Sequence, residues 1–141
     1  MFDYDKAKNN RFLEAQERSY EDALKEIRNG MKTSHWMWYI FPQIKGLGSS
    51  PAADYYALDN LEEAKEYLAD ATLRHRLLEI SNALLELEST DAKRIFGFTD
   101  SLKLRSSMTL FAAADPDCGV FKAVLDKFYG GEADGRTLEL I

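Results

Sequence analysis

Six consecutive large residues, Trp36 to Phe41, are the feature that most restricts how this chain can fold. Pro42 follows them, and proline lacks the N–H group that a continuing helix needs. Four of the six side chains carry aromatic rings, and each such ring removes about 150–250 Å² from water when it is buried. The run is too apolar for a solvated surface, so we expect it to form a buried core helix around which the rest of the chain packs.

The composition is that of one ordinary globular domain, which we expect to span residues 1–141. The chain is 45% hydrophobic, which is enough to build one core. Its net charge of −6 argues against general binding of nucleic acid or of an anionic membrane surface. The only cysteine, Cys118, cannot form an intramolecular disulfide, and with two histidines it matches no zinc-site spacing. We therefore expect no metal and no other cofactor.

The chain also has no run long enough to cross a membrane, and residues 1–10 contain no apolar signal core. These features favour a cytoplasmic protein with no membrane partner.

Apolar residues recur at helical spacing along most of the chain, which predicts an all-α fold. We expect a compact array of seven or eight short helices around the buried aromatic helix. The expected segments are Asn9 to Arg18; a helix capped by Ser19 with Tyr20, Leu24, Ile27 and Met31 buried; Trp36 to Phe41; Leu61 to Leu68, capped by Asn60; Leu73 to Leu87, capped by Asp70; a short segment capped by Asp91 and ended by Gly97; Ser101 to Ala114; a helix started by Asp115 and Pro116; and a tail from Asp134 to Ile141, capped by Asp134, that returns apolar residues to the core.

One of these assignments leaves an alternative open. Leucines in the segment Ser101 to Ala114 also alternate at period two, as in a strand, but Leu104, Met108 and Phe111 fit one helical face, which favours a helix. Gln16 falls on the apolar side of its helix, so we expect its amide to be satisfied by a backbone group. Between Lys45 and Asp54 the glycines, serines and proline predict a loop.

Acidic residues are missing from two segments of this acidic chain. The run Ile27 to Ala53 contains no Asp or Glu, although a uniform distribution would place about four or five there. The run Ser101 to Ala114 is also free of acids and contains two cations and several hydroxyl groups. If the two runs pack together, they form a pocket for a small ligand that carries phosphate or carboxylate, including nucleotide-like molecules.

Two groups of residues are candidates for this site, together with several single side chains. On a helix, Lys103 faces the same way as Ser106 and Ser107; the alternative is a solvated face whose serines bond to the preceding turn. The loop from Lys45 to Gly48 can form an anion-binding nest or an ordinary turn, and it matches neither the dinucleotide fingerprint nor the P-loop. The candidate ligand-binding residues are Lys32, Ser34, His35, Gln43, Lys45, Gly46, Gly48, Lys103, Ser106 and Ser107.

His35 is the candidate catalytic residue, because imidazole changes charge near neutral pH. It follows Ser34 directly, but adjacent serine and histidine do not by themselves make a triad; a carboxylate such as Asp100 would have to orient the ring. The alternative is a histidine at a helix start that is bonded within the fold.

The string from Lys32 to Gln43 (KTSHWMWYIFPQ), followed by Gly46-Leu47-Gly48, resembles the hallmark of a bacterial domain-of-unknown-function family, number 1810. The resemblance spans nearly the whole chain and implies an all-helical fold of about this length, with no established catalytic residues. Members are sometimes labelled calpastatin, but the calpain inhibitor of that name is a largely disordered repeat protein, unlike a chain with a dense core. Further matching segments are Arg11 to Gln16, Ile95 to Gly97, Lys103 to Phe111, Asp134, and Thr137-Leu138.

Three functions remain open from the sequence. The first is a binding domain for a small anionic ligand. The second is a hydrolase or transferase acting on such a ligand, with His35 as general base and Lys103 stabilising negative charge. The third is a protein-interaction module whose apolar groove takes a partner helix.

Overall fold

The computed structural model describes the backbone of residues 4–141 and the side chains of residues 9–141. Residues 1–3, the start of the segment in which we expect no signal core, lie outside the described residues. Across the described range the chain forms helices and no strands, which confirms the all-α prediction. The helices are α1 (Tyr4–Arg28), α2 (Met37–Ile40), α3 (Pro51–Tyr56), α4 (Leu61–Ala69), α5 (Ala71–Glu86), α6 (Ala92–Phe96), α7 (Phe98–Ala114), α8 (Gly119–Tyr129) and α9 (Gly135–Leu140).

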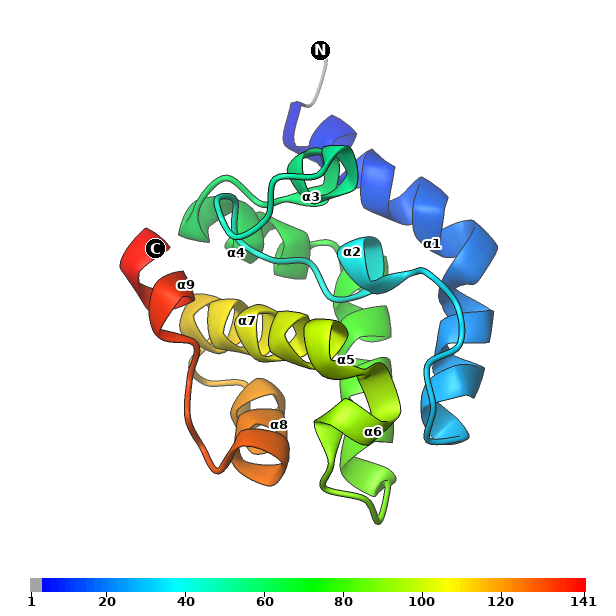
Figure 1. The fold of residues 1–141 in the computed structure, drawn as a ribbon. Coiled ribbons are helices and arrows are strands. Elements are labelled where there is room, and N and C mark those ends of the chain that lie inside the picture. Colours follow the sequence, from blue (N-terminus) through cyan, green and yellow to red (C-terminus); the bar gives the residue numbers. More distant parts are fainter. Residues whose placement is uncertain (1–3) are drawn as a thin grey trace.

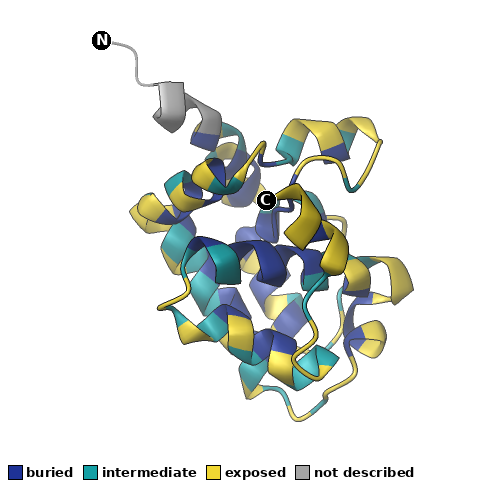
Figure 2. Cartoon of the chain, turned by 90° about the vertical axis from the view of Figure 1, so that its left-hand side faces the viewer, coloured by how far each residue is buried: buried dark blue, intermediate teal, exposed yellow. Residues whose placement is uncertain are grey.

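Helix α7 crosses the middle of the molecule and packs against α4, α6, α8 and α9 (Figure 1). Helix α1 packs against α5 and against the short α2, while α3 adjoins α2. The buried side chains of these helices form a common hydrophobic cluster, and the exposed residues lie on the outer faces (Figure 2). The segment that precedes α2 and the N-terminal part of α7 therefore lie in the same region of the fold, as the ion pair between Lys32 and Asp100 shows.

Polar N-caps start four of the helices where the sequence predicts them. In each case the cap side chain accepts a hydrogen bond from a backbone N–H in the first turn, which satisfies a donor that the helix itself cannot pair. These caps are Asn60 for α4, Asp70 for α5, Asp91 for α6 and Asp134 for α9.

The prediction of two N-terminal helices is wrong, because α1 runs without a break from Tyr4 to Arg28. Ser19 lies inside this helix and is not a cap; its Oγ accepts a hydrogen bond of 2.8 Å from the Tyr39 hydroxyl. No glycine or proline interrupts α1, so nothing forces a new start at this point. Gly30, at φ +79°, turns the chain away after the helix, and Met31 is 55% exposed and not buried as predicted.

The aromatic run forms only one turn of helix, α2, and only part of it is buried. Trp36 and Phe41 lie in the core, whereas Trp38 and Tyr39 are half-buried. One helical turn points its side chains in several directions, so a run of this length cannot bury all of them against one neighbour. The prediction of a fully buried central helix is therefore wrong for the two residues that reach the surface.

Three further boundaries differ from the prediction. The expected loop contains α3, which begins at Pro51 with Ser50 as its N-cap. Helix α8 begins at Gly119, after a turn that contains Asp115 and Pro116. Helix α9 packs against α7 through the buried Thr137, which leaves its leucines on the outer side, so the tail does not return them to the core.

Gln16 holds α1, α2 and α4 together. Its Nε2 atom donates hydrogen bonds to the backbone oxygen of Tyr39 at 2.8 Å and to the hydroxyl of Tyr67 at 3.0 Å. The prediction of a core glutamine satisfied by backbone is confirmed.

No helix within the described range is both long enough and apolar enough to cross a membrane.

Candidate ligand-binding cleft

A cleft of about 240 Å³ lies where the segment around α2, helix α7 and the start of α9 meet. It therefore combines parts of both acid-free runs with the C-terminal segment. Next to it is a small hollow of about 10 Å³, which is at the lower limit for one water molecule. The cleft is lined by Trp38, Gln43, Leu47, Gly48, Thr99, Leu102, Lys103, Ser106, Asp134 and Arg136.

Helix α7 supplies one wall of the cleft. Thr99, Leu102, Lys103 and Ser106 are spaced by three, one and three residues, so they lie on one face of the helix. Ser106 also donates a hydrogen bond of 3.1 Å to the backbone oxygen of Leu102, in the preceding turn. The helical interpretation of this segment thus accounts for a cation and a hydroxyl that face the same space.

Glu26, near the end of α1, holds the irregular segment that leads into the opposite wall. Its Oε1 atom accepts hydrogen bonds from the backbone N–H of Thr33 (2.6 Å), the backbone N–H of Ser34 (2.8 Å) and Nε1 of Trp36 (3.1 Å). Burial raises the pKa of this carboxyl, but the hydrogen bonds outweigh burial and lower the pKa to about 2. The carboxylate therefore stays ionised and fixes the chain just before Trp38.

Gly48 lets the loop after α2 approach α3 closely. A Cβ atom at this position would lie 2.9 Å from the Cβ of Ala53 and 3.6 Å from Cη2 of Trp38. The first distance is shorter than carbon atoms tolerate, so glycine is required for this packing. Gly48 thereby allows the loop to pack directly against the Trp38 ring.

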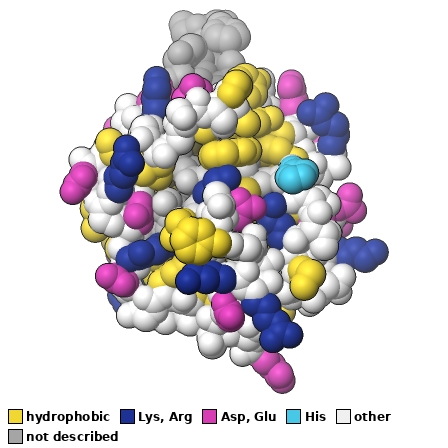
Figure 3. Space-filling view, in the orientation of Figure 1, with side chains coloured by type: hydrophobic (Ala, Val, Ile, Leu, Met, Phe, Trp, Pro, Cys, Tyr) yellow, Lys and Arg dark blue, Asp and Glu magenta, His cyan; other side chains and the backbone are white. Residues whose placement is uncertain are grey.

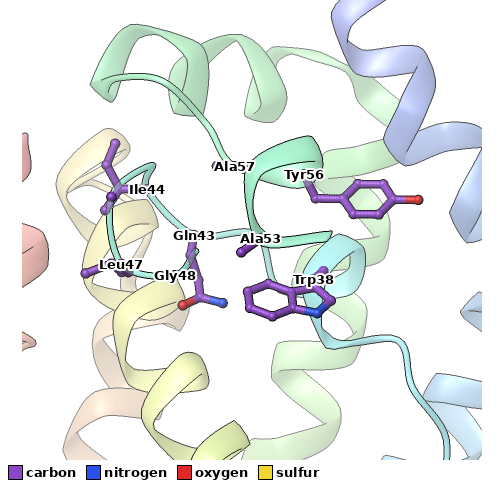
Figure 4. A pocket seen from close by; sticks show the side chains of 9 residues that line it. Trp38, Gln43, Ile44, Leu47, Gly48, Ala53, Tyr56 and Ala57 are labelled. Carbon is purple, nitrogen blue, oxygen red and sulfur yellow. The ribbon is translucent and has the colours of Figure 1, made fainter. Parts of the chain in front are cut away.

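Gln43 is the polar group in the cleft whose hydrogen bonding is incomplete. Its backbone oxygen accepts from Leu58 N at 2.9 Å, within a single bridge between Ile44 and Leu58. Its side chain is buried, with 7% of the residue exposed, and its Nε2 atom has no partner among the described residues. Figure 4 shows this amide nitrogen directed toward the indole of Trp38. A buried donor without a partner is costly, by about 1–3 kcal/mol, and is satisfied when a ligand supplies an acceptor.

A carboxylate, Asp100, balances part of the positive charge at this site. Asp100 pairs with Lys32 at 2.8 Å and with Lys103 at 3.2 Å, so one carboxylate bridges the two acid-free runs. Burial raises the pKa of Asp100, but hydrogen bonds from both lysines outweigh it and hold the pKa below its usual value. Arg136 donates to the backbone oxygen of Gly46 at 3.2 Å and lies at the other end of the cleft. Lys32, Lys103 and Arg136 against the two carboxylates of Asp100 and Asp134 leave one excess positive charge at the cleft.

Asp134 brings a negative charge into the cleft wall. Its Oδ2 atom accepts hydrogen bonds from Ser106 Oγ at 3.1 Å, from Thr137 N at 3.1 Å and from Thr137 Oγ1 at 2.5 Å. No lysine or arginine of the described residues lies within ion-pair distance of it. The surface over α6 and α7 accordingly mixes both signs of charge, below an apolar cluster over α2 and α3 (Figure 3).

The structure brings four of the ten candidate residues into the cleft wall: Gln43, Gly48, Lys103 and Ser106. Lys32 joins them through Asp100, and Gly46, at φ +104°, lines the adjoining hollow and binds Arg136 through its carbonyl. The remaining candidates are not part of the lining. Ser107 is fully buried with an unpartnered hydroxyl, while Lys45, Ser34 and His35 are exposed.

His35, the candidate catalytic residue, lies outside the cleft lining. Its backbone oxygen accepts a long hydrogen bond of 3.4 Å from the Tyr39 hydroxyl. The described residues provide no hydrogen bond or ion pair to its imidazole, and Asp100 is occupied by two lysines. No group of three His, Cys, Asp or Glu side chains suited to a metal ion occurs in the described part of the chain.

Sequence reasoning missed three important members of the site. Trp38 was expected in the core, and the ring instead forms a cleft wall. Asp134 was expected only as a helix cap, and Arg136 was not singled out. The sequence does place a helix cap, Asp134, two residues before a cation, Arg136, which is a weak sign of a polar site. Nothing in the sequence indicates that α9 packs beside the loop around Gly46.

The chain thus has an all-helical fold with a small cleft lined by side chains of both charges. The chain belongs to the family described as protein of unknown function (DUF1810), whose model matches residues 6–141. It is similar to the conserved hypothetical protein Rv1873 from Mycobacterium tuberculosis, a crystal structure, with 45% sequence identity, a TM-score of 0.91 and 94% of each chain covered. No curated protein matches the chain.

Proposed function

We propose that this domain binds a small ligand carrying a phosphate or carboxylate group in the cleft between α7 and the segment around α2. The buried, unpartnered Nε2 of Gln43 carries the proposal, because it is a donor held in place without an acceptor. Lys103 and Arg136 supply positive charge on the same cleft, and the Trp38 ring, which lies under the Lys103 ammonium, adds apolar surface beside it for another part of the ligand.

Two other functions have weaker support. The hydrolase or transferase alternative depends on His35, whose ring lies outside the cleft lining. The interaction alternative depends on a hollow of about 570 Å³ beside Phe98 and Leu102, which are 65% and 47% exposed. That hollow is larger than the cleft, but none of its described lining residues is a buried polar group without a partner. The binding proposal is preferred for this reason.

The test is a panel of nucleotides, sugar phosphates and small carboxylates, measured by thermal shift and by tryptophan fluorescence. Trp36 is buried and Trp38 lines the cleft, so a ligand in the cleft changes the emission of Trp38, and Trp38→Phe removes that signal. A ligand at about 100 times its Kd stabilises the fold by about 2.7 kcal/mol. We expect at least one anion to raise Tm by several degrees.

Gln43→Leu separates binding from folding. Because Nε2 has no partner in the free protein, leucine keeps or raises its stability, while ligand affinity falls. Lys103→Ala also weakens binding, and Lys122→Ala, an exposed lysine paired with Asp126 on α8, leaves it unchanged. The proposal fails if no anion in the panel shifts Tm, or if Gln43→Leu and Lys103→Ala bind as tightly as the wild-type protein.

A further inference from the structure

We propose that the ligand of this cleft is a hydroxyl-bearing anion of the sugar-phosphate or sugar-acid class, with Asp134 accepting a hydrogen bond from one of its hydroxyl groups. This inference rests on the proposed function and specifies the chemistry of the ligand. It follows from a carboxylate that lines a cleft together with cations but is not paired with them.

The two oxygens of Asp134 are used unequally. All three hydrogen bonds that reach the carboxylate end on Oδ2, from Ser106 and from the N–H and hydroxyl of Thr137. No hydrogen bond from the described residues ends on Oδ1. The backbone N–H of Asp134 also donates to Thr109 Oγ1 at 2.8 Å, so the residue is held firmly against α7. Oδ1 thus keeps free acceptor capacity on a residue that lines the cleft.

A simple anion would be disfavoured by this carboxylate. Ser106 follows Lys103 by three residues on α7, and neighbours at this spacing lie about 5–6 Å apart. The Lys103 ammonium pairs with Asp100, one turn toward the N-terminus of α7, whereas Asp134 bonds to Ser106, one turn toward the C-terminus, so the two charges lie more than one turn apart along the helix. A ligand therefore binds most tightly if its anionic group contacts Lys103 and Gln43. A hydrogen-bond donor a few bonds away in the same ligand would then donate to Asp134.

Hydroxyl groups are the donors that best meet this requirement. An ammonium donor would be repelled by Lys103 and Arg136, whereas a hydroxyl donates to a carboxylate without adding charge. Phosphorylated or carboxylated sugars and polyols carry both groups at a separation of a few bonds. The Trp38 ring would then face the carbon skeleton of the ligand.

Glycerol 3-phosphate and n-propyl phosphate provide the decisive pair, because they have the same carbon number and anion and differ in two hydroxyl groups. A hydrogen bond to a charged acceptor is worth about tenfold or more in affinity. We expect the wild-type protein to bind glycerol 3-phosphate about tenfold more tightly than n-propyl phosphate, as measured by calorimetry. Glycerate and propionate repeat the comparison with a carboxylate and identify which anion the cleft prefers.

Asp134→Asn changes the two affinities in opposite directions. Asparagine keeps an oxygen for Thr137 N but replaces the free acceptor with an amide and removes the negative charge. Binding of n-propyl phosphate therefore tightens a few-fold, while binding of glycerol 3-phosphate weakens. Asp117→Asn, at an exposed position outside the cleft, removes the same charge and serves as the control. Asp134→Ser also retains an N-capping side chain, should asparagine prevent folding.

The outcomes separate this inference from the proposed function. The inference is overturned if the wild-type protein binds both phosphates with equal affinity, or if Asp134→Asn raises the affinity for both. Asp134 then accepts no hydrogen bond from a ligand hydroxyl, while the proposal of anion binding stands. If neither phosphate nor either carboxylate binds, and no anion of the wider panel does, the proposed function is overturned and the inference with it.

Discussion

The ammonium of Lys103 lies 3.9 Å from the centroid of the Trp38 ring, which joins helix α7 to helix α2 across the base of the cleft. A cation over an indole face is stabilised by the ring quadrupole, by about 0.5–2 kcal/mol depending on its exposure to water. The same ammonium also pairs with Asp100 at 3.2 Å. Lys103 is therefore positioned before any ligand arrives, and little side-chain entropy remains to be lost on binding.

Asp100→Asn is expected to destabilise the protein and to strengthen anion binding. The change leaves the largely buried Lys32 without its ionised partner, which costs about 1.5–3 kcal/mol, the range for a hydrogen bond to a charged group. It also frees Lys103 from a competing carboxylate. Urea unfolding and phosphate titration measure the two effects.

Lys32→Met in the Asp100→Asn background is the control, and it should recover part of the stability. Because the pKa of Asp100 is lowered in the fold, its contribution is present above the usual carboxyl pKa and is lost as pH falls through the lowered value. Equal or higher stability of Asp100→Asn at pH 7 would contradict this account of the bridge.

Glu26→Gln is expected to make the free energy of unfolding depend less on pH at acid pH. The folded pKa of about 2 lies below the usual 4.5, so Glu26 stabilises the protein above about pH 4.5 and this contribution disappears as pH falls to about 2. Glutamine retains an acceptor but lacks the charge, and we expect a loss of about 1–2 kcal/mol at pH 7. Free energies of unfolding between pH 2 and 7 measure it. Glu21→Gln, exposed on the same helix, should leave the pH profile unchanged, and a profile for Glu26→Gln that parallels the wild type would refute the prediction.

Gly48→Ala is expected to cost about 1–3 kcal/mol, the usual range for overpacking. The added methyl meets the Cβ of Ala53 at 2.9 Å and has no flexible neighbour to displace. The same change should cost less in an Ala53→Gly background, where the opposing methyl is absent. Gly119→Ala is the matched control, because no atom lies within 4 Å of its added Cβ, and it should be neutral or stabilising. Thermal unfolding of the four variants tests this prediction. It would be contradicted if Gly48→Ala lowered the stability equally with Ala53 and with Ala53→Gly.

Gln16→Leu is expected to destabilise the protein more than Tyr67→Phe does. The first change leaves the Tyr39 carbonyl and the Tyr67 hydroxyl without their donor, at about 1–3 kcal/mol, while the second removes one acceptor from an amide that still has another. Because the two residues share a hydrogen bond, the double variant should cost less than the sum of the single ones. Additive free energies of unfolding would show that the two side chains act independently.

The helical architecture could be predicted because it depends on local signals. Periodic leucines and polar caps such as Asn60 and Asp70 act within one or two turns of helix, and the structure has both where the sequence indicates them. The misplaced boundaries arose where a local signal was ambiguous. Ser19 is as compatible with a helix interior as with a cap, and its partner, Tyr39, is distant in the sequence.

The site was only partly predictable, because it is assembled from segments that meet through packing. The absence of acids around Lys32 and from Ser101 to Ala114 identified two of its walls. The two acids that reduce the positive charge of the cleft lie outside those runs. Asp100 directly precedes one run, and Asp134 belongs to the C-terminal segment. A count of charges along the chain cannot show that these carboxylates fold back onto the lysine and serine they contact.

In the segment between α1 and α2, three hydrogen bonds end on a single oxygen atom of Glu26. Two peptide groups and one indole share that atom, so a single side chain fixes both the backbone that precedes α2 and the orientation of the Trp36 ring. The geometry of the whole connection therefore depends on the position of one carboxylate near the end of α1.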